Sequence, residues 1–319
     1  MKLKELYKAA IEIGIEADPR GKTEVRKVLD NKKKEFDKLS DDDKKFYDKD
    51  LLENPYPDSR ILAGDPEAEI AGILTGIDLE ASEAILADQL NSKGKNINLL
   101  LTHHPEGKAL VKLHEVMQVQ ADEWFHFGVP VNIGDVLIDE RMAEVQRNLM
   151  PINHNRAVDT AKILGLNYMS AHTVADNQVN QFVQKYLDDK KPDTVGDIVK
   201  VLREIPEYEH AAYDGSGPMI LVGSASKRPG EIFVDMTGGT EGPVGAIEKL
   251  ADAGVGTIVQ MHLGDKLRKK AEKHKINVVI AGHIASDNIG LNLLLDKLQS
   301  KGLTDNILTT SGFIRISRK

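Results

Sequence analysis

The stretch Ile97-Asn-Leu-Leu-Leu-Thr-His-His-Pro105 decides how the rest of the chain is interpreted. Its aliphatic run has the length and composition of a buried β-strand, and the proline ends the strand. Two neighbouring histidines, His103 and His104, therefore stand at the carboxyl end of the predicted strand. Adjacent imidazoles at this position have no packing role of their own, so we expect them to serve a site.

The same pattern occurs twice more along the chain. A short strand predicted over Asn167 to Ser170 leads into Ala171-His-Thr-Val-Ala-Asp176, and a strand predicted over Ile276 to Ala281 leads into Gly282-His-Ile-Ala-Ser-Asp287. Both sequences read His-x-x-x-Asp. In a helical turn, residues four apart project from one face, so each pair can direct an imidazole and a carboxylate at one point.

From about residue 61 onward, short aliphatic runs alternate with amphipathic helices, which is typical of α/β proteins with mostly buried strands. We predict a first α/β lobe over residues 61–190 and a second over residues 191–319. Residues 1–60 have helical spacing of apolar residues and a highly charged stretch at 41–50, and they predict a solvated N-terminal helical extension.

Composition excludes several classes of protein. The 319 residues are 41% hydrophobic and 29% charged, so the chain can bury an ordinary core and is neither fibrous nor disordered. The formal charge of −8 disfavours a nucleic-acid partner. No stretch approaches the roughly 20 apolar residues of a membrane span, and residues 1–7 lack the apolar region of a signal peptide, so we expect a cytoplasmic protein without a membrane partner.

Metal binding is the chemistry that the histidine motifs favour. In open α/β sheets, ligands collect outside the carboxyl ends of the strands. With no cysteine in the chain, metal ligands must be imidazole and carboxylate, which favour two divalent transition-metal ions (zinc, iron, manganese, cobalt or nickel) over copper(I). His103 and His104 can splay toward two centres, and a carboxylate can bridge ions about 3.5 to 4 Å apart.

At this point the sequence resembles the Nif-three-like family (NGG-one-interacting factor three), dinuclear-metal α/β proteins often described as GTP cyclohydrolase I type 2. The resemblance covers roughly residues 61 to 300. It is carried by four segments in order: Ile77-Asp-Leu, Leu99-Leu-Leu-Thr-His-His-Pro, Ser170-Ala-His-Thr-Val-Ala-Asp and Ala281-Gly-His-Ile-Ala-Ser-Asp.

This resemblance implies a fold of two α/β lobes around a dinuclear metal site, with a toroidal homo-hexamer as the assembly. It places metal ligands at His103, His104, Asp176, His283 and Asp287, with His172 among the ligands or directly beside them. As the catalytic residue in the mechanism that we expect, His172 orients a ligand or moves a proton. Three features depart from the family pattern: the family often has Glu at the position of Asp287, residues 129–155 look like an insertion, and residues 1–60 have no counterpart.

The function that we expect is metal-dependent hydrolysis of a nucleotide-like or other small polar substrate by a metal-activated water. The alternative is a non-catalytic oligomeric metal-binding scaffold or regulator. A DHH-type phosphoesterase is disfavoured, because that motif needs an Asp before the histidine pair and this chain has Thr102. The glycine-rich segment at residues 237–243 lacks the Lys-Ser/Thr of a phosphate-binding loop and predicts a tight turn instead.

Overall fold

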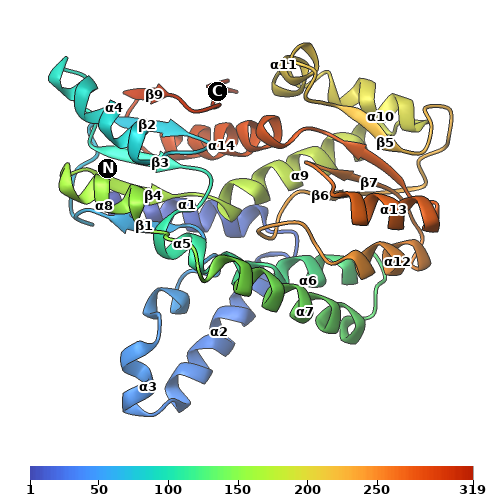
Figure 1. The fold of residues 1–319 in the computed structure, drawn as a ribbon, viewed down its shortest axis with the longest axis horizontal. Helices are drawn as coiled ribbons and strands as arrows, with labels where there is room; N and C mark the ends of the chain where they lie inside the picture. Colours follow the sequence, from blue (N-terminus) through green and yellow to red (C-terminus); the bar gives the residue numbers. More distant parts are fainter. Residues whose placement is uncertain (319) are drawn as a thin grey trace.

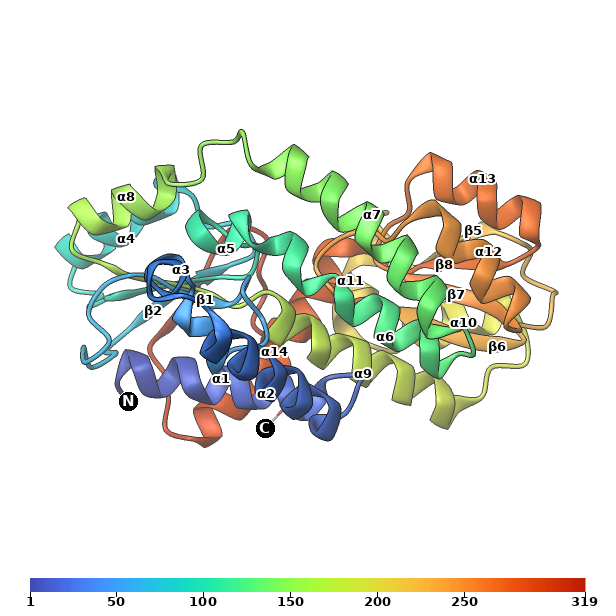
Figure 2. The same cartoon turned by 90° about the horizontal axis from the view of Figure 1, so that it is seen from below.

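The computed structural model describes residues 1–318, which form two α/β lobes (Figures 1 and 2). The first lobe contains a five-stranded sheet of order β1-β4-β3-β2-β9, and the second a four-stranded sheet of order β5-β8-β7-β6. The strands span β1 Arg60–Ala63, β2 Ile73–Gly76, β3 Leu99–Thr102, β4 Asn167–Ser170, β5 Met219–Val222, β6 Glu231–Asp235, β7 Val255–Gln260, β8 Asn277–Ile280 and β9 Ile307–Thr309.

The two sheets repeat one arrangement. In each, the first strand in the chain is an edge strand that pairs antiparallel with the fourth, and the remaining pairs are parallel. The register matches as well, because Gly76 pairs with Thr102 at the ends of β2 and β3, and Asp235 pairs with Gln260 at the ends of β6 and β7. The carboxyl ends of the second and third strands of each lobe are therefore equivalent positions.

Helices cover both faces of each sheet, because the side chains of the central strands alternate between the two faces and are buried on both. In β3, Leu99 and Leu101 join one apolar cluster and Leu100 joins another on the opposite face. The α-helices span α1 Leu3–Ala17, α2 Lys22–Lys38, α3 Asp41–Phe46, α4 Ala81–Ser92, α5 Gly107–Val111, α6 Gln118–His126, α7 Val131–Leu149, α8 Arg156–Ile163, α9 Thr173–Lys190, α10 Val195–Leu202, α11 Pro206–Tyr213, α12 Val244–Asp252, α13 Asp265–His274 and α14 His283–Ser300; 3₁₀ helices span η1 Lys49–Leu52 and η2 Leu113–Val116.

Helices α9 and α14 pack against each other and join the two lobes (Figure 1). Each contributes apolar residues to the clusters of both lobes. They approach very closely at Gly290, where a Cβ atom would lie only 2.4 Å from the carbonyl oxygen of Ala175. This close approach brings together the first turns of the two helices, which carry the two His-x-x-x-Asp sequences.

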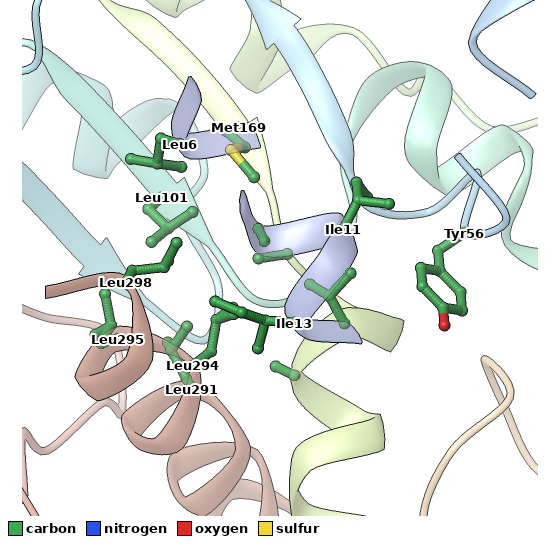
Figure 3. Close-up of a cluster of buried hydrophobic side chains, with 14 of the residues drawn as sticks. Leu6, Ile11, Ile13, Tyr56, Leu101, Met169, Leu291, Leu294, Leu295 and Leu298 are labelled. Carbon is green, nitrogen blue, oxygen red and sulfur yellow. The ribbon is translucent and has the colours of Figure 1, made fainter. Parts of the chain in front are cut away.

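The prediction that residues 1–60 form a solvated extension is wrong for α1. Leu3, Leu6 and Ala10 are fully buried, and α1 packs in the first lobe against α9 and α14 (Figure 3). The apolar face of α1 covers one face of the first sheet, and its buried side chains complete the apolar cluster there. In contrast, α2 and α3 project from the body of the molecule (Figure 1), and Phe46 is 91% exposed.

The structure departs from the predicted boundaries of the two lobes at two places. Strand β9, near the C-terminus, pairs with β2 in the first lobe rather than with the second sheet. Within residues 129–155, expected as an insertion, α7 contributes Ile138 and Val145 to the core of the second lobe, beside α6 (Figure 2). Among the described residues, no helix is long and apolar enough to cross a membrane.

Candidate metal centre

Six of the predicted site residues meet where the two lobes face each other. His103 and His104 follow β3, whereas the other four lie at the starts of α9 and α14. We call these six residues the His/Asp cluster: His103, His104, His172, Asp176, His283 and Asp287. The cluster is buried at His103, Asp176 and Asp287, and it opens toward solvent at His104 and His283.

The buried end of the cluster is centred on His103. Its Nδ1 hydrogen-bonds to the carbonyl oxygen of Ala171 at 3.2 Å, which makes Nδ1 the protonated nitrogen and leaves the lone pair on Nε2. The Nε2 atom lies 3.4 Å from Oδ1 of Asp176 and 3.4 Å from Oδ1 of Asp287. Although buried, Nε2 takes part in no hydrogen bond in the part of the chain that the structure describes.

The open end is centred on the second oxygen of Asp287. Its Oδ2 atom lies 3.5 Å from Nε2 of His104 and 3.6 Å from Nε2 of His283. Nδ1 of His104 donates to Oδ1 of Asp78 at 2.7 Å, so the carboxylate fixes both the orientation and the tautomer of this ring. Both carboxylate oxygens of Asp287 are buried without a hydrogen-bond partner among the described residues.

His172 is held by a carboxylate from the N-terminal segment. Its Nδ1 donates to Oδ2 of Asp58 at 2.9 Å, and the same oxygen accepts a hydrogen bond from Oγ1 of Thr173 at 2.6 Å. Burial opposes protonation of His172, but the carboxylates of Asp176 and Asp58 raise its pKa. The ring packs beside His103, with 5.0 Å between their centroids.

These contacts place the ligand atoms in three groups that could each hold an ion. The atoms within each group lie within 4.8 Å of one another. One group is His103, Asp176 and Asp287, a second is His104, His283 and Asp287, and a third is His103, His104 and His172. The buried His/Asp cluster could therefore bind metal, and Asp287 belongs to two of its groups.

The two carboxylates of the cluster have opposite electrostatic environments. Burial favours the neutral acid at Asp176 and raises its pKa to about 6. Burial acts in the same direction at Asp287, but the surrounding imidazoles hold its pKa well below the ordinary value. At His104, burial is outweighed by Asp287 and Asp78, which raise the pKa to about 10, whereas burial lowers the pKa of His283 to about 4. Asp287 is thus the carboxylate that the histidines keep ionised.

A cavity of about 320 Å³ opens directly onto the cluster. His104, His172 and His283 form one side of it together with Asp176 and Asp287. The second lobe contributes further lining residues from the ends of β6 and β7 and from the glycine-rich turn: Asp235, Met236, Thr237, Gly239, Thr240, Glu241, Gly242, Gln260, Met261 and His262. The cavity volume lies in the range of small-molecule sites.

Several residues of this site were not predicted from the sequence. Asp78 lies in the segment Ile77-Asp-Leu that resembles the family, but its contact with His104 depends on the fold. Asp235 and Gln260 are the last residues of β6 and β7, so the rule that ligands collect at strand ends could have found them. Asp58 carries no such signal, because it lies 114 residues from His172 in a proline-containing turn.

Comparison with known proteins supports the fold. Neither a protein-family model nor a curated protein matches the sequence. The structure is similar to that of a NIF3 superfamily protein from Sphaerobacter thermophilus, with 23% sequence identity, a TM-score of 0.69, and coverage of 81% of this chain and 92% of that one. It is also similar to reduced HcgD from Methanocaldococcus jannaschii, with 16% identity, a TM-score of 0.50, and coverage of 79% and 88%.

These similarities define the class of fold. The chain has the fold of the NIF3 superfamily, which confirms the predicted arrangement of α/β lobes with an additional N-terminal helix. Within that fold, the chain carries a buried His/Asp cluster that could bind metal.

Proposed function

We propose that the chain binds two divalent transition-metal ions in the His/Asp cluster and hydrolyses a small polar substrate. One observation carries the proposal: Nε2 of His103 and both oxygens of Asp287 are buried without a hydrogen-bond partner among the described residues, although Nε2 lies only 3.4 Å from Oδ1 of Asp287. Leaving such atoms unpaired destabilises a folded protein, so a ligand is the simplest explanation. Atoms about 2.1 Å from one tetrahedral ion lie about 3.4 Å apart, close to the separations of 3.4 to 3.6 Å in the cluster.

Asp287 is the residue that we assign to both ions. Its Oδ1 atom faces His103 and its Oδ2 atom faces His104 and His283, so one carboxylate can bridge two positions. Asp176 would then complete the buried position. Zinc, iron, manganese, cobalt and nickel all accept this set of imidazole and carboxylate ligands.

When bound, the ions supply Lewis acidity that lowers the pKa of water and polarises a substrate oxygen. The residues of the chain set the conditions for that chemistry. Asp78 and the Ala171 carbonyl fix the tautomers of His104 and His103. His172, held by Asp58 at the edge of the cavity, orients the reacting groups or carries a proton. The adjoining cavity gives a small substrate access, which favours catalysis over a purely structural site.

The first test is the metal content of the purified, untagged protein, measured by elemental analysis. We expect about two equivalents of transition metal per chain. His104→Ala and Asp176→Ala should each lose at least one equivalent, whereas His126→Ala, which removes an exposed imidazole on α6, should lose none.

Absence of transition metal in the wild-type protein, even after incubation with Zn²⁺ or Mn²⁺, would contradict the proposal. Hydrolysis of amide, cyclic amidine and phosphoester substrates is measured next on the loaded protein. Turnover that disappears in Asp176→Ala supports the hydrolase. Two bound ions without turnover on any of these substrates would support the metal-binding scaffold instead.

A further inference from the structure

Asp235 and Gln260 form a polar pair that lines the same cavity as the His/Asp cluster. They end β6 and β7 and pair in the sheet register. Nε2 of Gln260 donates to Oδ2 of Asp235, which orients the amide and leaves its oxygen facing away from the carboxylate. That oxygen has no hydrogen-bond partner within residues 1–318, although Gln260 is only 5% exposed. The pair therefore presents an unused acceptor that a ligand could satisfy.

The fold itself does not require this pair. The equivalent positions in the first lobe are Gly76 and Thr102, which also pair in register at the ends of their strands. There Oγ1 of Thr102 donates to the carbonyl oxygen of Ile77 at 3.1 Å. The first lobe therefore has a hydrogen bond at its strand ends that needs no carboxylate. A half-buried carboxylate and a buried amide at the same place in the second lobe need another reason.

The charge of the cavity indicates which ligand groups fit. None of the described residues that line it is Lys or Arg. Glu241 adds a second carboxylate on the wall of the second lobe, with Oε1 4.0 Å from Nδ1 of His262. Beyond the His/Asp cluster, nothing neutralises a chain of phosphates, whereas acceptors for N–H groups are abundant. Burial also raises the pKa of Asp235 to about 6, and a cationic partner would relieve that cost.

We propose that Asp235 and Gln260 bind an amino, amidino or guanidino group of the substrate while the reacting oxygen of the substrate lies at the metal centre. The inference rests on the proposed function and narrows the class of substrate. The substrate is a small molecule with an N–H-donating end, and oligophosphates are excluded as the group bound at this wall. The Asp235 carboxylate and the Gln260 amide oxygen together accept two N–H donors, as an amidinium or guanidinium offers.

The test uses hydroxamic acids as probes, because a hydroxamate head chelates zinc whatever its tail carries. Three compounds with six-carbon chains are compared on zinc-loaded protein by titration calorimetry: hexanohydroxamic acid, 6-aminohexanohydroxamic acid and the monohydroxamate of adipic acid, with four-carbon analogues of each. We expect the ammonium tail to bind at least tenfold more tightly than the methyl tail, and the carboxylate tail to bind most weakly.

Two variants and one control assign that preference to the pair. Asp235→Asn keeps the shape and removes the charge, and Gln260→Ala removes the free acceptor; each should reduce the ammonium preference to threefold or less. Glu140→Gln, which removes an exposed carboxylate of α7 outside this cavity, should leave the preference unchanged.

The outcomes separate the two proposals. Equal binding of all three tails, tighter binding of the carboxylate tail, or an ammonium preference that survives in Asp235→Asn and Gln260→Ala would overturn the inference and leave the metal centre intact. Failure of every hydroxamate to bind the zinc-loaded protein would overturn both the inference and the proposed function.

Discussion

Asp58 shows how much of the site depends on residues without a motif. It is fully buried, and it accepts hydrogen bonds from His172, Thr173 and Ser59. Its backbone carbonyl also accepts from Oγ of Ser170 at 2.8 Å, which ties the N-terminal segment to the end of β4. A carboxylate behind a histidine fixes the tautomer of the ring and raises its basicity as a ligand, and His172 belongs with His103 and His104 to the third group of atoms that could hold an ion.

Asp58→Asn should therefore weaken metal binding without unfolding the protein. Asn keeps the size of the side chain but removes the charge that faces His172. We expect metal affinity to fall about 10- to 100-fold, measured by competition with a chelator, together with a changed visible spectrum of the Co²⁺-loaded protein. Asp88→Asn, on an exposed position of α4, is the control. Unchanged affinity and an unchanged Co²⁺ spectrum would show that Asp58 serves packing alone.

The sequence predicts the residues at the centre of the site better than the residues that hold them in position. Local spacing in the sequence is enough to predict the central residues, because they follow strand ends or share one helix face: His103, His104, Asp176, His283 and Asp287. The structure places them in one cluster. Asp58 and Asp78 act through contacts that only the tertiary fold creates, and no local pattern distinguishes them from other aspartates.

At the scale of elements, α1 contributes to the core and α3 does not. Leu6 is fully buried among side chains of α14 and the first sheet (Figure 3), whereas Phe46 of α3 is 91% exposed. Leu6→Ala should lower the free energy of unfolding by about 2 to 5 kcal/mol, because it leaves a cavity in a packed cluster. Phe46→Ala should change it by less than about 0.5 kcal/mol.

Chemical denaturation of the two variants, followed by circular dichroism, provides the measurement. Similar unfolding free energies for Leu6→Ala and wild type would mean that α1 is dispensable for the first lobe. The error in the sequence prediction has a physical cause: the periodicity of α1 shows an apolar face, but only the uncovered face of the first sheet determines whether that face is buried.

Strands were predictable where they were buried on both faces. The central strands β3, β4, β7 and β8 are aliphatic runs or follow directly from the alternation with helices. The edge strands β1 and β9 were missed, since three or four residues without a continuous apolar run give no periodic signal. Their positions follow from pairing with β4 and β2, which is a property of the assembled sheet.

At the scale of the whole molecule, the repeated sheet arrangement explains why the two His-x-x-x-Asp sequences meet. Each follows the fourth strand of its lobe and opens one of two packed helices, so the pairing of α9 and α14 joins the halves of the site. The repetition was not visible in the sequence, because the equivalent strand ends differ in residue type, as at Gly76 and Asp235.

We also propose that the chain forms a homo-oligomer, which is the assembly that the family resemblance of its sequence motifs implies. Light scattering during size-exclusion chromatography should give a multiple of the 35.2 kDa chain mass, with six copies expected. Exposed apolar side chains such as Ile163, Tyr213 and Met150 are available for contacts between copies. A single species at the mass of one chain, across micromolar concentrations, would contradict this prediction.

The return of β9 to the first sheet has a consequence for the order of synthesis. The first lobe completes its sheet only when residues 307–309 pair with β2, after the whole second lobe has been translated. A growing chain on the ribosome therefore exposes His103 and His104 long before Asp287 can join them. Because domains tend to fold as units during translation, we expect the finished polypeptide, rather than a nascent one, to acquire its ions.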